Sequence, residues 1–152
     1  MTNMKIRVAT ETDAPTLARF RYKLRSHAQM TESEAEFIAR CTAWMEERLR
    51  SSSAWRCWIA ECDEGPCGNV WAQMVEKIPN PAAETECYVY LTNFYVREEY
   101  RSQGIGTRLL SDVLAWSKAK NAHTVILWPR ERSKSLYARH GFTAAVDLMQ
   151  LV

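Results

Sequence analysis

One segment of the chain combines residue types whose spacing points directly to chemistry. It runs from Tyr95 to Leu110 and contains the pattern RxxGxG between Arg101 and Gly106, at the junction between an apolar strand and an amphipathic helix. Two glycines let the backbone curl closely around a ligand. The first N–H groups of the following helix have no intrahelical partner and lie at the positive end of the helix dipole. The segment therefore predicts a cradle for a phosphate or pyrophosphate.

Two familiar nucleotide sites do not fit this glycine pair. A P-loop requires GK followed by Ser or Thr, which the run Gly104-Ile105-Gly106-Thr107-Arg108 does not supply. A dinucleotide-binding fingerprint requires a third glycine and an acidic residue after a later strand near the N-terminus, and the third glycine is missing. What remains is a phosphate cradle in the second half of a small chain.

Length and composition predict a single globular domain over residues 1–152. The chain has 47% apolar and 25% charged residues, which is ordinary for a globular protein of this size. The net charge of +2 comes from 20 basic residues interleaved with 18 acidic ones, which argues against a nucleic-acid partner. No apolar run approaches the length needed to span a membrane, so no membrane partner is expected.

The cysteines are expected to be reduced thiols of a cytoplasmic protein. There are five, an odd number, and the segment Met1 to Thr10 is polar and charged where a signal peptide would be apolar. Cys57, Cys62 and Cys67 recur every five residues, but the sequence contains no CxxC and its three histidines lie far apart. We therefore expect no metal, and a structural role for these cysteines on two paired strands.

Apolar patterns and breaking residues predict the elements that position the cradle. The expected strands cover residues 5–9, 55–62, 67–77, 87–96, 123–128 and 142–151. Helices are expected to start at the capping residues of 12–15, at a capping box in Thr31-Glu32-Ser33-Glu34, at Gly104 and at Arg132. The second ends near Arg50, the third near Lys120 and the fourth at His140, with Gly141 as its C-terminal cap.

The resulting order is β-α-α-β-β-β-α-β-α-β, and its second half implies a right-handed parallel crossover. With RxxGxG after the fourth strand and LYxxxGF at Leu136 to Phe142 after the fifth, the chain resembles the GCN5-related N-acetyltransferases (GNAT) over essentially its whole length. This resemblance implies an α+β (α/β) acyl-CoA N-acyltransferase fold. Its sheet would be mixed and mostly antiparallel, with a parallel, splayed pair formed by the fourth and fifth strands.

The resemblance implies acetyl-CoA as the acyl donor and CoA as a product. Backbone groups of the fourth strand would pair with the pantetheine arm, and N–H groups of the glycine loop would hold the pyrophosphate. Arg101 would shape the turn. Many relatives have an asparagine after the fifth strand that bonds the pantetheine, and Ser133 could replace it here. Lys134 could meet a CoA phosphate or could simply be solvated. The residues implied to contact the donor are Phe94, Tyr95, Val96, Arg101, Ser102, Gln103, Gly104, Ile105, Gly106, Thr107, Ser133 and Lys134.

Tyr137 matches the tyrosine that protonates the leaving thiolate of CoA in many members of the family. A phenol with an ordinary pKa of roughly 10 stays protonated at neutral pH and can donate as the C–S bond breaks. The alternative is a tyrosine that only packs its ring beneath the CoA tail. Attack by the amine is expected to be direct, in a ternary complex, because no cysteine or serine lies in a nucleophile motif. A free strand N–H near Val96 would polarise the carbonyl oxygen.

The expected acceptor is the primary amine of a small molecule, which must lose its proton before it attacks. The middle of the fourth strand, Tyr88 to Asn93, contains no carboxylate. The base could be Glu84 or Glu86, Glu32 or Glu34, or a water held by Tyr90, Thr92 or Asn93. The candidate acceptor-site residues are Glu32, Tyr90, Thr92 and Asn93. The four glutamates could favour a cationic amine, or could belong to a capped helix start and a solvated loop.

Two other functions fit the same residues. The absent carboxylate is compatible with a non-catalytic acyl-CoA binding or sensing module. An acceptor groove open at both ends would instead favour a peptide or protein N-terminal acetyltransferase. A homodimer is possible, since dimers are frequent in such folds.

Overall fold

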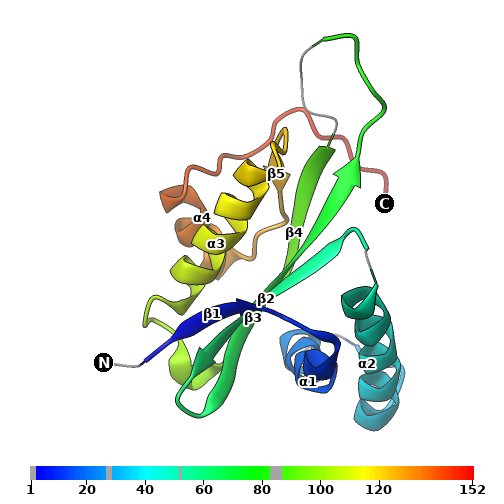
Figure 1. Cartoon of the computed structure of the whole chain (residues 1–152), viewed down its shortest axis with the longest axis vertical. Helices are drawn as coiled ribbons and strands as arrows, with labels where there is room; N and C mark the ends of the chain where they lie inside the picture. Colours follow the sequence, from blue (N-terminus) through cyan, green and yellow to red (C-terminus); the bar gives the residue numbers. More distant parts are fainter. Residues whose placement is uncertain (1–2, 27–28, 52, 83–86) are drawn as a thin grey trace.

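A mixed sheet of five strands forms the centre of the computed structural model, which describes residues 3–26, 29–51, 53–82 and 87–152 (Figure 1). The strands are β1 (Lys5–Val8), β2 (Trp55–Cys62), β3 (Gly65–Glu76), β4 (Cys87–Val96) and β5 (Val125–Ile126). They lie in the order β1-β2-β3-β4-β5. The first three pairings are antiparallel and the β4–β5 pairing is parallel, so the predicted fold class is confirmed.

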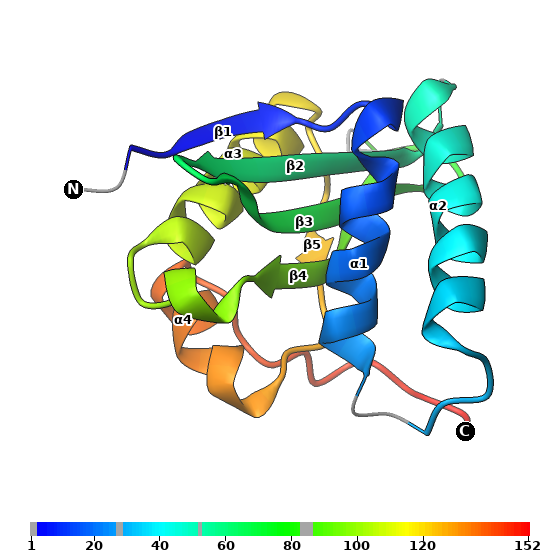
Figure 2. The ribbon, with the colours of Figure 1, turned by 90° about the horizontal axis from the view of Figure 1, so that it is seen from below.

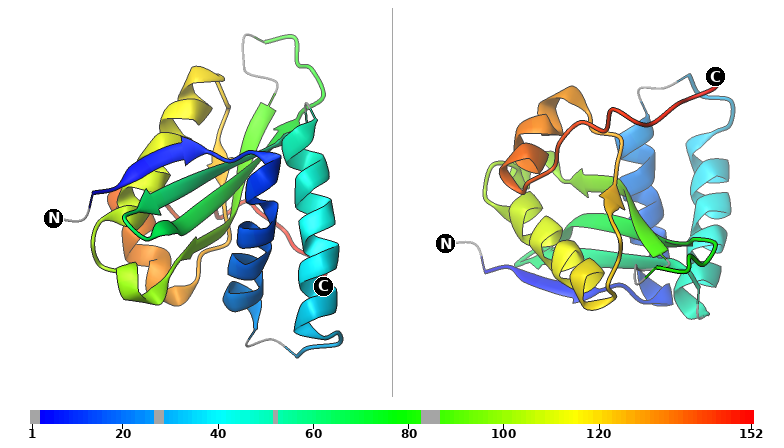
Figure 3. Two further views of the ribbon diagram at one scale, coloured as in Figure 1. Left: turned by 60° about the horizontal axis from the view of Figure 1, so that its bottom comes forward. Right: turned by 90° about the horizontal axis from the view of Figure 1, so that it is seen from above.

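Helices cover both faces of the sheet (Figures 2 and 3). Helices α1 (Ala14–Arg25) and α2 (Glu34–Arg50) pack on one face, and α3 (Ile105–Ala119) and α4 (Lys134–Arg139) lie on the other. Short 3-10 turns precede α1, α3 and α4 at Glu11–Asp13 (η1), Glu98–Tyr100 (η2) and Glu131–Ser133 (η3). Among the residues that the structure describes, no helix is long and apolar enough to cross a membrane.

The alternation of side chains along β2 produces two separate cores, one on each face of the sheet. Trp58 and Ala60 face α3, while Cys57 and Ile59 face α1 and α2. Both helical layers supply stripes at a spacing of three and four residues. The predicted core positions Leu17, Phe20 and Leu24 of α1 and Ile105, Leu109 and Val113 of α3 are all buried. The two cores hold the sheet firmly between its helical layers.

Helix boundaries follow the capping chemistry, with one correction. The capping box of α2 is formed by Ser33 and Glu36 rather than starting at Thr31: Ser33 Oγ accepts from the Glu36 N–H at 3.2 Å, and the Ser33 N–H donates to Glu36 Oε2 at 3.0 Å. Gly141 caps α4 as predicted, with φ of +91° and its N–H donating to the Ala138 carbonyl at 3.1 Å.

The predicted last strand, 142–151, does not form. This segment has no strand pairing and runs outside the sheet as an extended tail (Figure 1). Beyond the partly buried Phe142, its large apolar side chains are exposed, with Val146 at 89% and Met149 at 95%. Apolar alternation alone does not make a strand, because the ladder needs a partner and β5 is only two residues long.

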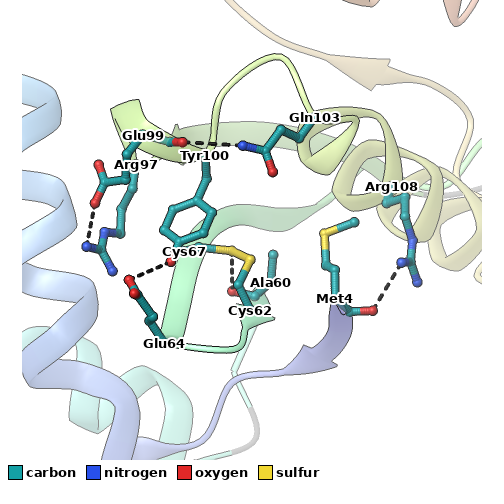
Figure 4. Close-up of a disulfide and its surroundings, with 10 residues drawn as sticks. All are labelled: Met4, Ala60, Cys62, Glu64, Cys67, Arg97, Glu99, Tyr100, Gln103 and Arg108. Atoms are coloured by element: carbon teal, nitrogen blue, oxygen red, sulfur yellow. Dashed lines mark hydrogen bonds and ion pairs between the residues drawn. A yellow bond between two sulfur atoms is a disulfide. The ribbon is translucent and has the colours of Figure 1, made fainter. Parts of the chain in front are cut away.

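The expectation that all the cysteines are reduced is wrong for Cys62 and Cys67. They form a disulfide across the β2–β3 turn, with Cα atoms 6.1 Å apart (Figure 4). Cysteines 57, 62 and 67 do lie on two paired strands, as predicted. The closed turn supports the segment that follows β4: the Arg97 N–H donates to the Cys67 carbonyl at 2.8 Å, and the Tyr100 hydroxyl donates to Glu64 Oε2 at 2.9 Å.

The double variant Cys62→Ala/Cys67→Ala is expected to lose about 2 kcal/mol of unfolding free energy, because a short disulfide loop restricts the unfolded chain by roughly that amount. Urea denaturation curves equilibrated with and without dithiothreitol measure the effect. The reductant should lower the midpoint of the wild-type protein and leave that of the double variant unchanged. A wild-type midpoint that does not respond to the reductant would contradict a stabilising disulfide.

Candidate active site

Strands β4 and β5 separate soon after they pair. Their only register partners in the described chain are Val89 with Val125 and Tyr90 with Ile126, whereas β4 continues to Val96. Residues 91–96 therefore have a strand neighbour on the β3 side alone. Backbone N–H and C=O groups require partners when they are shielded from water, so this free edge can pair with an extended ligand. The splayed pair predicted from the sequence is confirmed.

A β-bulge at Asn93 controls which backbone groups face the free edge. Asn69 pairs with Tyr95 and Trp71 with Thr92, so both Asn93 and Phe94 lie opposite Val70. Asn93 has φ of +56°, which asparagine tolerates better than most residues. Sequence reasoning missed this bulge, although an asparagine within an aromatic and β-branched strand was a usable signal.

The bulge reverses the direction of the N–H groups further along β4. The Val89 N–H donates toward β5, to the Thr124 carbonyl at 2.9 Å, but the Arg97 N–H donates toward β3, to Cys67. In a regular strand, residues an even number apart direct their N–H groups to the same side, so the extra residue has switched the alternation. The N–H groups of Phe94 and Val96 consequently face the free edge.

The conformation of Asn93 is fixed by a chain of amide contacts. Its Nδ2 donates to Oδ1 of the fully buried Asn69 at 3.3 Å. Its Oδ1 accepts from Arg21 Nη1, which reaches from α1, at 3.2 Å. The bulge is therefore anchored both to the core of the sheet and to the helix that covers it.

The glycine loop follows β4, and its backbone geometry is compatible with a phosphate cradle. Arg101 Nε donates to the Val96 carbonyl at 2.9 Å, which ties the loop back to the end of the strand. Gly104 has φ of +83°, a conformation that favours glycine. The first bond of α3 runs from the Arg108 N–H to the Gly104 carbonyl at 3.1 Å, so the N–H groups of residues 105–107 have no intrahelical partner.

The free edge and the cradle border one cleft of about 620 Å³, a usual size for a small-molecule site. Most of the predicted site residues line it. They are Tyr90, Thr92, Asn93, Phe94, Val96, Arg101, Ser102, Gly104, Ile105, Gly106, Thr107, Ser133 and Tyr137.

Three residues predicted to contact the donor do not line the cleft. The Tyr95 side chain is buried on the opposite face of the sheet, with its ring centroid 5.2 Å from that of Phe20. The Gln103 side chain donates to a backbone carbonyl of η2 at 3.3 Å. Lys134 forms an ion pair of 2.7 Å with Glu131. The side chains of Gln103 and Lys134 are therefore engaged within the protein.

The glutamates considered as bases or acceptor ligands do not meet in the cleft. Glu32 forms an ion pair with Arg40 and lines a second hollow of about 180 Å³, which shares Arg25 with the cleft. Glu34 is exposed in the first turn of α2. Glu84 and Glu86 lie outside the described residues. The assignment of Glu32 to the acceptor site stays a prediction, and in the structure its carboxylate pairs with Arg40 of α2.

Tyr137 reaches the cleft from α4 and is only 7% exposed. Its ring packs edge-on against Phe94, with centroids 6.3 Å apart, and against Phe142 at 5.5 Å. Its hydroxyl has no hydrogen-bond partner within the described chain. Burial raises the pKa of Tyr137 to about 12. The phenol is thus held as a proton donor, because desolvation disfavours the phenolate.

The sequence analysis missed a group of cations on the cleft wall. Arg21 and Arg25 come from α1, and Arg130 follows β5. No aspartate or glutamate occurs among the described residues that line the cleft. The sequence did contain a signal for this group. Arg21 and Arg25 follow the buried Ala18 at spacings of three and four residues, which places them on the same side of α1.

Comparisons with known proteins agree with this architecture. Residues 21–142 match the model of the Acetyltransferase (GNAT) family. A GCN5-related N-acetyltransferase from Ralstonia eutropha JMP134 is 22% identical over 99% of each chain, with a TM-score of 0.81. A predicted acetyltransferase with acetyl-CoA from Clostridium acetobutylicum is 20% identical over 99% of this chain and 96% of that one, with a TM-score of 0.83.

The aminoglycoside N-acetyltransferase AAC(6')-Iy, solved in complex with CoA, is 18% identical over 100% of this chain and 95% of that one, with a TM-score of 0.73. At these identities the likeness concerns the fold. A search of curated proteins found no significant match.

The residues present fit an acyl-CoA. The free edge of β4 offers N–H and C=O groups to the amides of a pantetheine arm, and the N–H groups at the start of α3 offer donors to a pyrophosphate. Arg101 and Arg132 also line the cleft and add positive charge to it.

Replacing Gly104 by alanine is expected to weaken acetyl-CoA binding about 10-fold, because a left-handed conformation costs a residue with a Cβ roughly 1–2 kcal/mol. Isothermal titration measures the dissociation constant. Gly65→Ala is the matched control, since Gly65 also has a positive φ, of +102°, but does not itself line the cleft. Equal affinity in the two variants would show that the Gly104 conformation does not support the cradle.

Proposed function

Because the chain belongs to the GNAT acetyltransferase family, we propose that it transfers the acetyl group of acetyl-CoA directly to a primary amine of a small molecule, in a ternary complex. The observation that carries this proposal is the placement of Tyr137 beside the free edge of β4, in the same cleft as the glycine cradle. Acetyl-CoA supplies a thioester whose carbonyl carbon accepts the amine.

The backbone of β4 has two tasks in this proposal. Outward-facing N–H groups of Phe94 and Val96 pair with the extended arm of the donor, as a neighbouring strand would. An N–H on the same edge donates to the carbonyl oxygen, where negative charge develops in the transition state. Because the bulge at Asn93 is anchored on Asn69 and Arg21, these donors are fixed before the substrates bind.

Tyr137 acts as the general acid. Its hydroxyl is protonated throughout the physiological range because burial raises its pKa, and it has no competing hydrogen-bond partner in the described chain. It can therefore donate to the sulfur as the C–S bond breaks.

The amine loses its proton without a carboxylate from the described lining. Two features support this step. The Tyr90 hydroxyl donates to Thr92 Oγ1 at 3.2 Å, which provides a hydroxyl pair able to pass a proton to water. The arginines of the cleft disfavour a second positive charge and so lower the pKa of a bound ammonium group.

The lack of a carboxylate in the described lining also favours a second candidate, a non-catalytic acyl-CoA binding or sensing module. Release of the CoA thiol distinguishes the two functions. The assay uses acetyl-CoA with a panel of amino acids, amino alcohols, polyamines, aminoglycosides and N-terminal peptides. Tight acetyl-CoA binding without turnover on any member of the panel would favour the sensor. Turnover on the peptides alone would favour N-terminal acetylation.

Tyr137→Phe is expected to lower kcat by about 100-fold while the dissociation constant for acetyl-CoA changes little, because a general acid contributes at least about that factor. Steady-state CoA release and titration with acetyl-CoA give the two quantities. Tyr22→Phe serves as a matched control, since Tyr22 packs against Phe37 on the α1–α2 side of the molecule, away from the cleft. An unchanged kcat in Tyr137→Phe would remove the acid role.

The pH profile offers a separate test. With no carboxylate or histidine among the described lining residues, log(kcat/KM) should rise with unit slope from about pH 6 to about pH 9, following the free amine, whose ordinary pKa is roughly 10.4. A descending limb from Tyr137 would begin only near its raised pKa of about 12. A plateau above an inflection between about pH 5 and pH 8 would instead reveal a titrating base on the protein.

A further inference from the structure

Three arginines from distant parts of the sequence gather on the acceptor side of the cleft. Arg21 and Arg25 lie one turn apart on α1, and Arg130 lies just beyond β5. Arg130 Nη2 donates to the Leu24 carbonyl at 2.8 Å, which brings the segment after β5 against the end of α1. Arg21 reaches Asn93, the bulged residue of β4. The group therefore lies beside the point where we place the acetyl transfer.

Within the described residues these three arginines have no carboxylate partner, and the printed acceptors of Arg21 and Arg130 are uncharged. Arg7, by contrast, forms ion pairs with Asp13 at 2.7 Å and Glu61 at 2.8 Å. Burial and the neighbouring arginines lower the pKa of Arg21 and of Arg130. Like charges held together without counter-charges are unfavourable, so the free cleft has the electrostatics of a site that awaits an anion.

The phosphates of the donor do not account for all of this charge. Their cradle is formed by the glycine loop and by Arg101 at the end of β4, whereas Arg21 contacts β4 at Asn93. Asn93 precedes Val96 by three residues, so the two contact points lie at different positions along β4. The charges of Arg25 and Arg101 both help to lower the pKa of Arg130. Arg130 therefore lies between the acceptor end and the phosphate end of the cleft. Arg21 and Arg25 belong to the acceptor end.

We infer that the acceptor carries an anionic group, a carboxylate or a phosphate, close to its primary amine, and that Arg21, Arg25 and Arg130 bind this group. The inference rests on the proposed function and narrows its substrate class. Arginine suits the role because its planar guanidinium can donate two parallel hydrogen bonds to either anion. The edge-on pair of Tyr90 and the 60% exposed Trp128, with ring centroids 5.3 Å apart, provides an apolar surface for the body of the same molecule.

The arrangement also selects against the opposite class of acceptor. A polyamine or other polycation would bring further positive charge to a wall without carboxylates in its described lining, and like-charge juxtaposition is an effective means of rejection. Of the glutamates that had suggested a cationic amine, Glu32 pairs with Arg40 and Glu34 is exposed at the start of α2, while the remaining two lie outside the described residues. The positive charge of the cleft thus favours an anionic acceptor over the cationic amine considered from the sequence.

The first test compares acceptors in matched pairs. The panel contains amines with a carboxylate beside the same amines as neutral amides, for instance β-alanine and β-alaninamide. It also contains phosphate esters beside the free alcohols, for instance O-phosphoethanolamine and ethanolamine, and diamines of equal length. The best acceptor should be anionic, with kcat/KM about 10-fold or more above its neutral partner. A best acceptor that is neutral or cationic would overturn the inference. The carboxylate and phosphate arms show which anion is bound.

The second test changes the charge of the wall. Arg25 is exposed, so its substitution leaves the core intact. Arg25→Gln should raise KM for the anionic acceptor about 10-fold with little change in kcat, and Arg25→Glu should remove or reverse the preference over the neutral partner. Arg19→Gln is the matched control, because Arg19 is exposed on the same helix but does not line the cleft. Equal KM values in Arg25→Gln, Arg19→Gln and the wild type would overturn the assignment.

Binding measurements separate this inference from the proposed function. Isothermal titration of the CoA-bound protein with the same panel reports anion binding without any turnover. If no amine is acetylated but the anionic amines bind and Arg25→Glu abolishes their binding, the proposed function fails and the anion site stands. If amines are acetylated but the anionic members neither bind more tightly nor react faster than their partners, the function stands and the inference fails.

Discussion

The departure of β4 from β5 after Tyr90 is the constraint on which the rest of the molecule depends. A sheet that continued to pair here would satisfy its own backbone groups and leave nothing to bind a ligand. Because the strands separate, the following stretch of β4 keeps one free edge, and α1 and α4 can bring Arg21 and Tyr137 to either side of it. The bulge at Asn93 then determines which donors that edge presents.

A free edge is useful only if the strand that carries it is rigid, and the structure supplies that rigidity from both faces. β4 shares its β3 side with a long antiparallel ladder, and each face of the sheet is buried under a separate helical layer. The β2–β3 turn, closed by Cys62 and Cys67, contacts the start of the glycine loop through Arg97 and Tyr100. The anion cradle is thus attached to the sheet at both of its ends, by this turn and by α3.

Features set by nearby residues could be predicted from the sequence, and features set by distant pairings could not. The loop around Gly104 and the cap at Gly141 depend on a few adjacent residues, so their patterns were sufficient. Apolar alternation predicted a last strand wrongly, because a strand also requires a free partner of adequate length. The bulge at Asn93 depends on register with β3, and the arginine group joins positions 21 and 130, which are unrelated in the sequence. The disulfide between Cys62 and Cys67 required the geometry of their turn.

The arginines that line the cleft also affect the rate at which charged ligands reach it. Positive charge spread along one concave surface focuses its field outward and accelerates the arrival of anions, and added salt weakens this attraction over a Debye length of about 8–10 Å. CoA carries several phosphates, so donor, spent CoA and an anionic acceptor would all be drawn to the same mouth of the cleft. The ionic strength of the surroundings would then govern how quickly the site fills and how long a product occupies it before the next turnover.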